Sequence, residues 1–224
     1  MRGLMAVGAR IRPGGGPPTG CVRQHNTRGG MRMSNSDPQT ALDRFAQFVH
    51  RLIDGRDPDL AEHHARSSDI SIKLCQRIGC TPSEIKLIAI ASAMHDLGKM
   101  SINEHILNKP ARLTKTEFEL IKQHSVIGGH LLEPLGLDVK VTQVVVHHHE
   151  NFDGSGYPEA LRGEDIPYLA RIMRITDSYD ALTADRPYHK GVSSQDAVTI
   201  LLKDSRFYDP YLLESFCQLM QTGR

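Results

Sequence analysis

Several features that would mark other classes of protein are scarce in this chain of 224 residues. It has no tryptophan, only 5% aromatic residues, and four cysteines that form no CxxC pair. A disulfide framework or a thiolate zinc site is therefore not expected. We expect reduced thiols in a cytoplasmic protein instead. No window approaches the roughly 18 to 20 continuous apolar residues that a membrane span needs. The formal net charge of +1 gives no bulk electrostatic reason to expect a nucleic-acid polymer or an anionic membrane as partner.

Alternating apolar and polar residues, the pattern of a β-strand, are also lacking, and the chain after Asp37 follows helical patterns. Proline or a capping residue stands at the start of each expected helix. The expected helices cover residues 37–54, 58–78, 81–98, 114–132, 138–149 and 167–182, and two more begin at Ser193 and Asp209. The sequence predicts an all-α fold, an irregular single-domain helical bundle with a metal site in its core.

Three parts are expected along the chain. Residues 1–36 are rich in Gly, Pro and Arg and lack apolar periodicity, so they cannot bury enough surface to offset their ordering entropy and are expected to be disordered. Residues 37–54 form an N-terminal helix, and residues 55–224 form the domain. The helix has an apolar stripe that either packs on the domain, the preferred interpretation, or makes a homodimer: Leu42, Phe45, Val49 and Leu52.

Histidine is unusually abundant: ten of the twelve fall between His50 and His149. The sharpest motif is His95-Asp96-Leu97-Gly98-Lys99. Its adjacent imidazole and carboxylate offer a mixed nitrogen and oxygen ligand set, which suits Mn, Fe or Zn. Lys99 lies one turn after His95 and on the same side if the helix continues that far. The alternative is a His-Asp pair that only helps to end a helix.

A second motif, residues 147–158, reads HHHENFDGSGYP. Three successive imidazoles cannot share one helical face because neighbours are separated by about 100°. Two of them can still converge where a helix ends, and the glycines and proline that follow make a loop whose backbone can approach a ligand closely. The alternative is a solvated polar helix terminus, where the helix dipole favours His.

Three single residues complete the pattern: His63, His124 and Asp177, each within a helical stretch. Taken alone, each is more typical of a hydrogen-bonded polar group in the core than of a ligand. Burying several unpaired polar groups, however, would cost a few kcal/mol each. A shared metal cluster satisfies all of them at once, so together they indicate a metal centre.

These residues carry a resemblance to a known family. The segments HHAR, HDLGK, KQHSVIGGH, HHHENFDGSGYP and ITDSYDALTADRPYHK, in this order, resemble the HD-GYP domain, a subgroup of the HD phosphohydrolase superfamily, over residues 55–220. The resemblance implies a phosphodiesterase that hydrolyses cyclic di-GMP to the linear dinucleotide, with GMP as a further product. It also implies a centre of two or three divalent metal ions, iron or manganese.

Carried over by position, the resemblance implies a role for each motif residue. Asp96 would bridge two metals, Lys99 would lie beside the scissile phosphate, and these two are the expected catalytic residues. Gly156, Tyr157 and Pro158 would shape the loop beside the site, and Arg186 would meet a substrate phosphate. The implied metal ligands are His63, His95, Asp96, His124, His148, His149 and Asp177.

The sequence also departs from the family pattern. Relatives with a third metal have Glu where this chain has Asp59, whose shorter reach leaves a third metal open. The basic residue expected three places after Arg186 is His189, so a phosphate contact there is weaker or shifts to Lys190.

His147 lies outside the ligand pattern and is expected to be an exposed helix residue. Glu150 and Asp153 are expected to orient the ligating imidazoles.

Two rival functions stay open at this point. One is an HD phosphohydrolase acting on another nucleotide, such as a hybrid cyclic dinucleotide. The other is a non-catalytic module that senses cyclic di-GMP or docks a signalling protein through the GYP loop. Degenerate relatives usually lose ligands, and all seven are present here, so catalysis is favoured.

Overall fold

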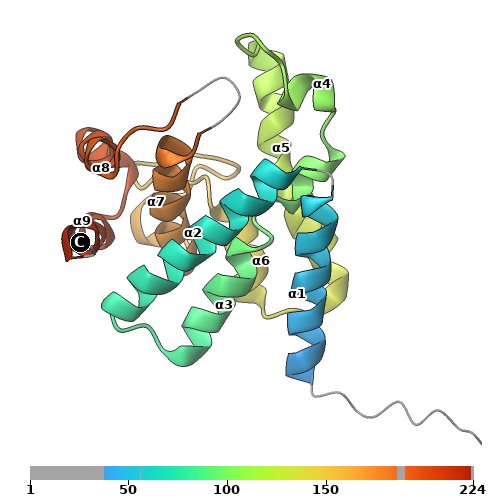
Figure 1. The fold of residues 1–224 in the computed structure, drawn as a ribbon, viewed down its shortest axis with the longest axis horizontal. Helices are drawn as coiled ribbons and strands as arrows, with labels where there is room; N and C mark the ends of the chain where they lie inside the picture. Colours follow the sequence, from blue (N-terminus) through green and yellow to red (C-terminus); the bar gives the residue numbers. More distant parts are fainter. Residues whose placement is uncertain (1–37, 56, 186–189, 223–224) are drawn as a thin grey trace, which may run out of the picture. The chain divides into compact units, whose positions relative to one another are not determined.

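A computed structural model describes residues 38–55, 57–185 and 190–222, and all regular elements in these ranges are helical (Figure 1). This confirms the predicted all-α class. The expected leader, residues 1–36, lies outside the described ranges. The α-helices are α1 Pro38–Asp54, α2 Pro58–Arg77, α3 Pro82–Ser92, α4 Glu104–Leu107, α5 Lys115–Leu132, α6 Val139–His147, α7 Tyr168–Thr183, α8 Ser194–Lys203 and α9 Pro210–Thr222. Short 3₁₀ helices are η1 Leu97–Ser101, η2 Glu133–Leu135, η3 Gly163–Asp165 and η4 Ser205–Phe207.

Most helices begin where their capping residues predict. Thr81 and Thr114 each form a capping box, accepting from the backbone N–H of a glutamate three residues later, whose carboxylate accepts from the backbone of the threonine. Asp138 and Ser193 cap α6 and α8 more simply, each with a side-chain oxygen that accepts from one backbone N–H. These observed caps confirm the predicted starts. They could be predicted because the residues of each capping signal lie close together in the sequence.

The helix expected to reach Gly98 ends at Ser92 instead, and η1 follows after a turn. Nδ1 of His95 lies 2.8 Å from the carbonyl oxygen of Ser92, which a continuing helix would need for its own backbone. The backbone N–H of Leu97 donates to Met94, a tighter 3₁₀ pattern. His95 and Asp96 therefore lie in a turn, and Lys99 lies on η1 rather than one α-helical turn after His95.

Helix α2 packs against α1, α3, α7 and α9, and Figure 1 shows it crossing the bundle diagonally. Helix α5 packs against η1 and α6. Side chains from these helices form one hydrophobic core, in which Leu74 of α2 is fully buried, with Ile70 partly buried against it. No helix in the part of the chain that the structure describes is both long enough and apolar enough to cross a membrane.

The stripe predicted for α1 is partly wrong. Val49 and Ile53 are buried in the core and Phe45 is half-buried against it, so α1 packs on α2. Leu52 remains 47% exposed, because burial of Ile53 turns the buried face of the helix away from it. The side chain of Leu42 lies outside the described part of the chain.

Candidate metal centre

The seven side chains expected to bind metal lie together in the core, although they come from five parts of the chain. Their ligand atoms fall into two groups, and within each group all of the atoms lie within 4.8 Å of one another. One group is Asp96, His124, His148 and His149; the other is His63, His95 and Asp177. Helices α2, α5 and α7 each contribute one member, and the turns that follow α3 and α6 contribute the others. The convergence places polar groups where a packed core would otherwise be apolar.

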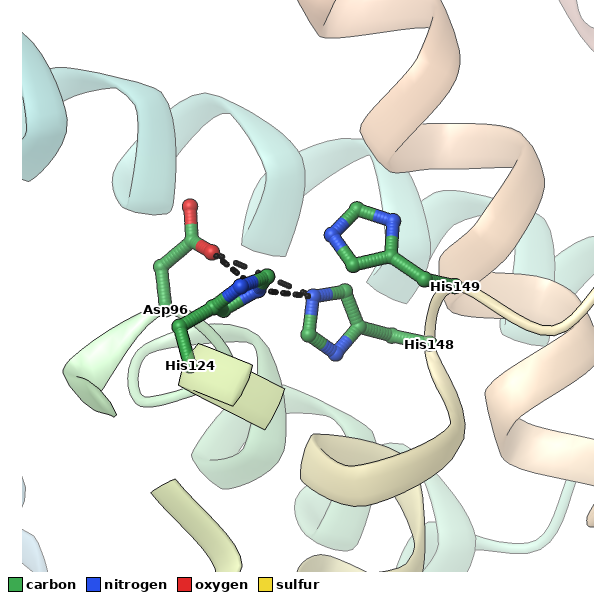
Figure 2. Close-up of side chains that lie close together, drawn as sticks. All are labelled: Asp96, His124, His148 and His149. Atoms are coloured by element: carbon green, nitrogen blue, oxygen red, sulfur yellow. Dashed lines mark hydrogen bonds and ion pairs between the residues drawn. The ribbon is translucent and has the colours of Figure 1, made fainter. Parts of the chain in front are cut away.

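Asp96 joins the two groups. Its Oδ1 lies 3.2 Å from Nε2 of His124, and its Oδ2 lies 3.5 Å from Nε2 of His95. Figure 2 shows the carboxylate, His124 and His148 turned toward a common point, with His149 alongside. Oδ1 has no hydrogen-bond partner within the described residues although it is buried. A carboxylate with one oxygen toward each group has the geometry of a bridging ligand.

Backbone hydrogen bonds fix the tautomers of three of these imidazoles. The Nδ1 atoms of His95, His124 and His148 lie 2.8, 2.7 and 2.8 Å from carbonyl oxygens three residues earlier in the chain. A carbonyl oxygen only accepts, so each Nδ1 carries the hydrogen and each neutral ring presents the lone pair of Nε2. This is the arrangement in which metal-ligating histidines are usually held.

The Nε2 atoms of these imidazoles and of His63 face one another in two pairs. Nε2 of His124 lies 3.3 Å from Nε2 of His148, and Nε2 of His63 lies 3.1 Å from Nε2 of His95. Two lone pairs at such a distance repel unless a proton or a cation lies between them. Two nitrogens bound to one metal at about 2.0–2.1 Å would be separated by a similar distance.

The electrostatics of the two groups differ. Burial holds the pKa of His148 well below its usual range and lowers the pKa of His149 to about 3, so a proton is disfavoured there. Burial also lowers the pKa of His63, but hydrogen bonds to Asp177 and Asp180 outweigh it and raise that pKa to about 9. The group around His63 therefore attracts positive charge, and the group around His148 offers neutral ligands.

The carboxylates stay ionised in this setting. Burial acts to raise the pKa of Asp96, but Lys99 and the neighbouring imidazoles hold it well below the usual range. For Asp177, burial is likewise outweighed by the hydrogen bond with His63. Lys99 forms an ion pair with Oδ2 of Asp96. The donor set of neutral imidazoles and anionic carboxylates fits a divalent cation of the Mn, Fe or Zn type.

The loop after α6 borders this cluster. The ring of Tyr157 lies 4.8 Å from the ring of His149, centroid to centroid, and its backbone N–H donates to the carbonyl of His149. A Cβ added to Gly156 would lie 2.2 Å from the backbone nitrogen of Asn151, so the loop folds back on itself only with glycine there. Pro158 follows through a cis peptide bond. The predicted GYP segment therefore lies beside the cluster of histidines and aspartates.

The protein-family comparison matches the HD domain family over residues 47–212. The chain belongs to the HD domain family. The HD domain superfamily expected from the motifs is thereby confirmed.

Several proteins to which the chain is similar are named as phosphodiesterases. A cyclic di-GMP phosphodiesterase of Pseudomonas aeruginosa is 36% identical over 155 residues, 69% of this chain and 37% of the relative. The cyclic di-GMP phosphodiesterase response regulator RpfG of Xanthomonas campestris is 35% identical, over 74% of this chain and 44% of the relative. A 3'3'-cGAMP-specific phosphodiesterase of Vibrio cholerae is 33% identical, over 75% of this chain and 33% of the relative. The HD domain chain thus spans less than half the length of each of these three relatives.

A solved structure described as an HDG"Y"P protein from Bdellovibrio bacteriovorus has the same fold. It superposes with a TM-score of 0.62 at 20% identity, covering 82% of this chain and 63% of the other. At this identity the likeness concerns the fold alone.

Other expected site residues of the HD domain fall outside the cluster. Asp59, in the first turn of α2, is exposed and belongs to none of the groups of ligand atoms found within the described residues. Lys190 is exposed. Arg186 and His189 lie outside the described residues, so their expected phosphate contacts stay predictions.

Three expectations about the loop are wrong. Glu150 accepts hydrogen bonds from the backbone N–H groups of Glu159 and Leu161, so it holds the loop rather than an imidazole. Asp153 accepts from Ser155 within the same turn. The side chain of His147 is only 12% exposed, because its ring folds back onto α6 and Nδ1 bonds the carbonyl of Gln143.

Sequence reasoning missed two residues of this HD domain that lie against the candidate ligands. Asp180 accepts a hydrogen bond from Nδ1 of His63 at 2.6 Å and is held by Arg66. His64 is buried beside His95. Both stand in motifs already singled out, HHAR and DSYDAL, but only the fold shows which way their side chains turn.

Proposed function

We propose that this HD domain is a metal-dependent phosphodiesterase that hydrolyses cyclic di-GMP to the linear dinucleotide, with GMP as a further product. The observation that carries the proposal is the pair of facing Nε2 atoms of His124 and His148. Both rings have their hydrogen on Nδ1, and burial disfavours a proton on His148. A divalent cation is the group that best satisfies both lone pairs.

In this proposal each group of side chains holds one cation, and Asp96 contributes an oxygen to both. Divalent cations held by these residues would supply a nucleophile from water at neutral pH and would neutralise charge on the phosphate. Iron and manganese are the proposed metals, because the ligands are imidazoles and carboxylates with no thiolate among them. We propose two cations, since exposed Asp59 gives no support for a third.

The remaining residues bind and orient the substrate. The Lys99 ammonium, on the edge of the cluster, contributes positive charge to the non-bridging phosphate oxygens, an electrostatic effect that needs no proton transfer. Gly156, Tyr157 and Pro158 form a wall over His149, where the Tyr157 ring limits how the substrate enters. Arg186 and Lys190 supply further phosphate contacts.

The partners follow from the same proposal. Because the proposed substrate is a cyclic dinucleotide messenger, we propose that the enzyme acts in the cytoplasm. We expect no nucleic-acid polymer as a partner. Contact of the GYP loop with a signalling protein, and homodimer formation through α1, stay predictions from the sequence.

The test is cleavage by protein purified without air. Metal content is measured first, then cyclic di-GMP is supplied with Mn²⁺ or Fe²⁺ and the products are separated. We expect the linear dinucleotide as the product, and we expect no such product when His124 is changed to Gln. Protein that binds the dinucleotide and contains metal but yields no product would instead support the non-catalytic module.

A second candidate substrate is 3'3'-cGAMP, favoured by the likeness to a Vibrio cholerae phosphodiesterase specific for it. Both dinucleotides present the same phosphodiester to the metal cluster and differ in one base. Parallel assays with cyclic di-GMP, 3'3'-cGAMP and cyclic di-AMP at equal concentration separate the two by comparison of kcat/KM.

A further inference from the structure

His64 is a buried imidazole that the expected ligand pattern leaves unused. It follows His63 on α2 and is only 1% exposed. Neither of its ring nitrogens has a hydrogen-bond partner within the part of the chain that the structure describes. A neutral imidazole carries one N–H and one lone pair, and buried polar atoms are nearly always paired. His64 therefore needs a partner that the described side chains do not provide.

The surroundings of His64 indicate what that partner is. Its ring centroid lies 4.7 Å from that of His95, and ligand atoms of His64, His95 and Asp96 all lie within 4.8 Å of one another. Two ligand atoms of one cation, each about 2.0–2.2 Å from it, lie at most about 4.4 Å apart. A small movement of the ring is enough to bring His64 into such a set.

We propose that His64 is a further ligand of the cation that His95 and Asp96 hold. His95 has only one lone pair, on Nε2, because its Nδ1–H is used by Ser92. His95 belongs both to the group with His63 and Asp177 and to the group with His64 and Asp96. Since its single lone pair binds one cation, the two groups form one site and not two.

This inference rests on the proposed metal centre and deepens it. Without His64, this cation has two imidazoles, from His63 and His95, and the carboxylates of Asp96 and Asp177. The other cation has three imidazoles and Asp96. With His64 both cations have three nitrogen ligands. Added imidazole favours Fe²⁺ and later metals over Mn²⁺. His64 is thus a residue that sets metal preference at one position.

The test replaces His64 by Leu, which fills similar space without a lone pair. His147→Leu is the control, since the largely buried imidazole of His147 belongs to none of the ligand groups found within the described residues. Metal-free full-length proteins are titrated with Co²⁺ while the visible absorption bands, which report coordination, are recorded. Unfolding temperature is measured with and without metal.

We expect His64→Leu to weaken one of the cobalt sites at least about tenfold. It should also change the absorption bands and reduce the rise in unfolding temperature that metal causes. The metal-free variant should unfold at the same or a higher temperature, because an unpaired buried group is gone. His147→Leu should bind Co²⁺ as the wild type does.

Unchanged affinity and bands in His64→Leu would overturn the inference while leaving the metal centre intact. Wild-type protein that binds no Co²⁺ would overturn both this inference and the proposed function. If the Leu variant does not fold, His64→Gln takes its place with the same expected loss of affinity. Normal affinity in the Gln variant would count against the proposal.

Discussion

Asp180 accepts a hydrogen bond from Nδ1 of His63 at 2.6 Å. An ionised carboxylate only accepts, so Nδ1 of His63 carries a hydrogen, and Nε2, which faces His95, is the ring atom left to hold either a proton or a cation. Arg66 holds Asp180 from the other side, with Nε 2.6 Å from Oδ1. Helices α2 and α7 are thereby joined by a chain of contacts that sets the orientation of His63, one of the proposed ligands.

Replacing Asp180 by Asn should loosen this ligand without removing it. The amide accepts more weakly than a carboxylate and leaves Arg66 with a poorer partner. We expect metal affinity to fall about 10–100-fold, measured by competition with a chelator of known affinity. Asp165→Asn, on the exposed surface, is the control and should bind as wild type does. Equal affinities for the Asp180 variant and wild type would refute the positioning role.

Gly98 permits η1 to lie directly against α5. A Cβ at this position would stand 1.9 Å from the carbonyl oxygen of His124 and 2.7 Å from the backbone nitrogen of Gly128. Gly98→Ala must push the two segments apart, which we expect to cost about 1–3 kcal/mol or more in the free energy of unfolding. Metal content should fall as well, since Asp96 and His124 lie on the separated segments. Denaturant titration and metal analysis check both.

Gly55→Ala is the matched control for Gly98, since its Cβ would meet the carbonyl oxygen of Arg51 at an ordinary 3.4 Å. A Gly98 variant with wild-type stability would show that η1 and α5 are not packed as closely as the structure has them.

Glu150 holds the GYP loop through two backbone N–H groups. The N–H of Glu159 lies 2.7 Å from Oε1 and that of Leu161 lies 3.1 Å from Oε2. Gln at this position has one accepting oxygen and one donating amide, so one N–H loses its acceptor at a cost of about 1–3 kcal/mol. Faster hydrogen exchange of these two amides is expected, with KM affected and metal content unchanged.

The control for Glu150→Gln is the exposed Glu164→Gln, which should exchange as wild type does. Loss of bound metal with normal amide exchange would instead restore the interpretation from the sequence, in which Glu150 orients an imidazole.

The stabilisation that Glu117 gives to the start of α5 depends on pH. Its hydrogen bond with Lys109, together with the backbone N–H of Thr114, lowers its pKa from 4.5 to about 2. A depressed pKa stabilises the fold fully above pH 4.5, and this stabilisation is lost as the pH falls through about 2. Glu117→Gln should therefore unfold at a lower temperature than wild type at neutral pH, and the difference should shrink in acid.

The matched variant for Glu117 is Glu119→Gln, also on α5 and exposed. It should show the same profile as wild type. A difference between Glu117→Gln and wild type that stays constant down to pH 2 would contradict the assigned contacts.

A structural feature could be predicted from the sequence when the residues that cause it lie close together in the chain. The starts of α3 and α5 were predictable, since the capping partners of Thr81 and Thr114 lie three residues away. The end of α3 at Ser92 was not, because a side chain from the following turn, His95, takes its last carbonyl. The resemblance to the HD-GYP domain implied seven candidate ligands, and the fold brings all seven together.

The positions missed are those set by packing between helices. His64 and Asp180 have no local signal that separates them from surface polar residues, and their burial arises where α2 meets α3 and α7. Asp59 shows the opposite case: a place in the motif pattern did not bring it into the cluster.

The most direct measurement is an anomalous-scattering map of crystals grown with Mn²⁺ in the absence of air. The account predicts one peak bonded to Nε2 of both His124 and His148, and another bonded to Nε2 of both His63 and His95, with Asp96 between the two peaks. Crystals with these imidazoles in place but no peak among them would contradict it.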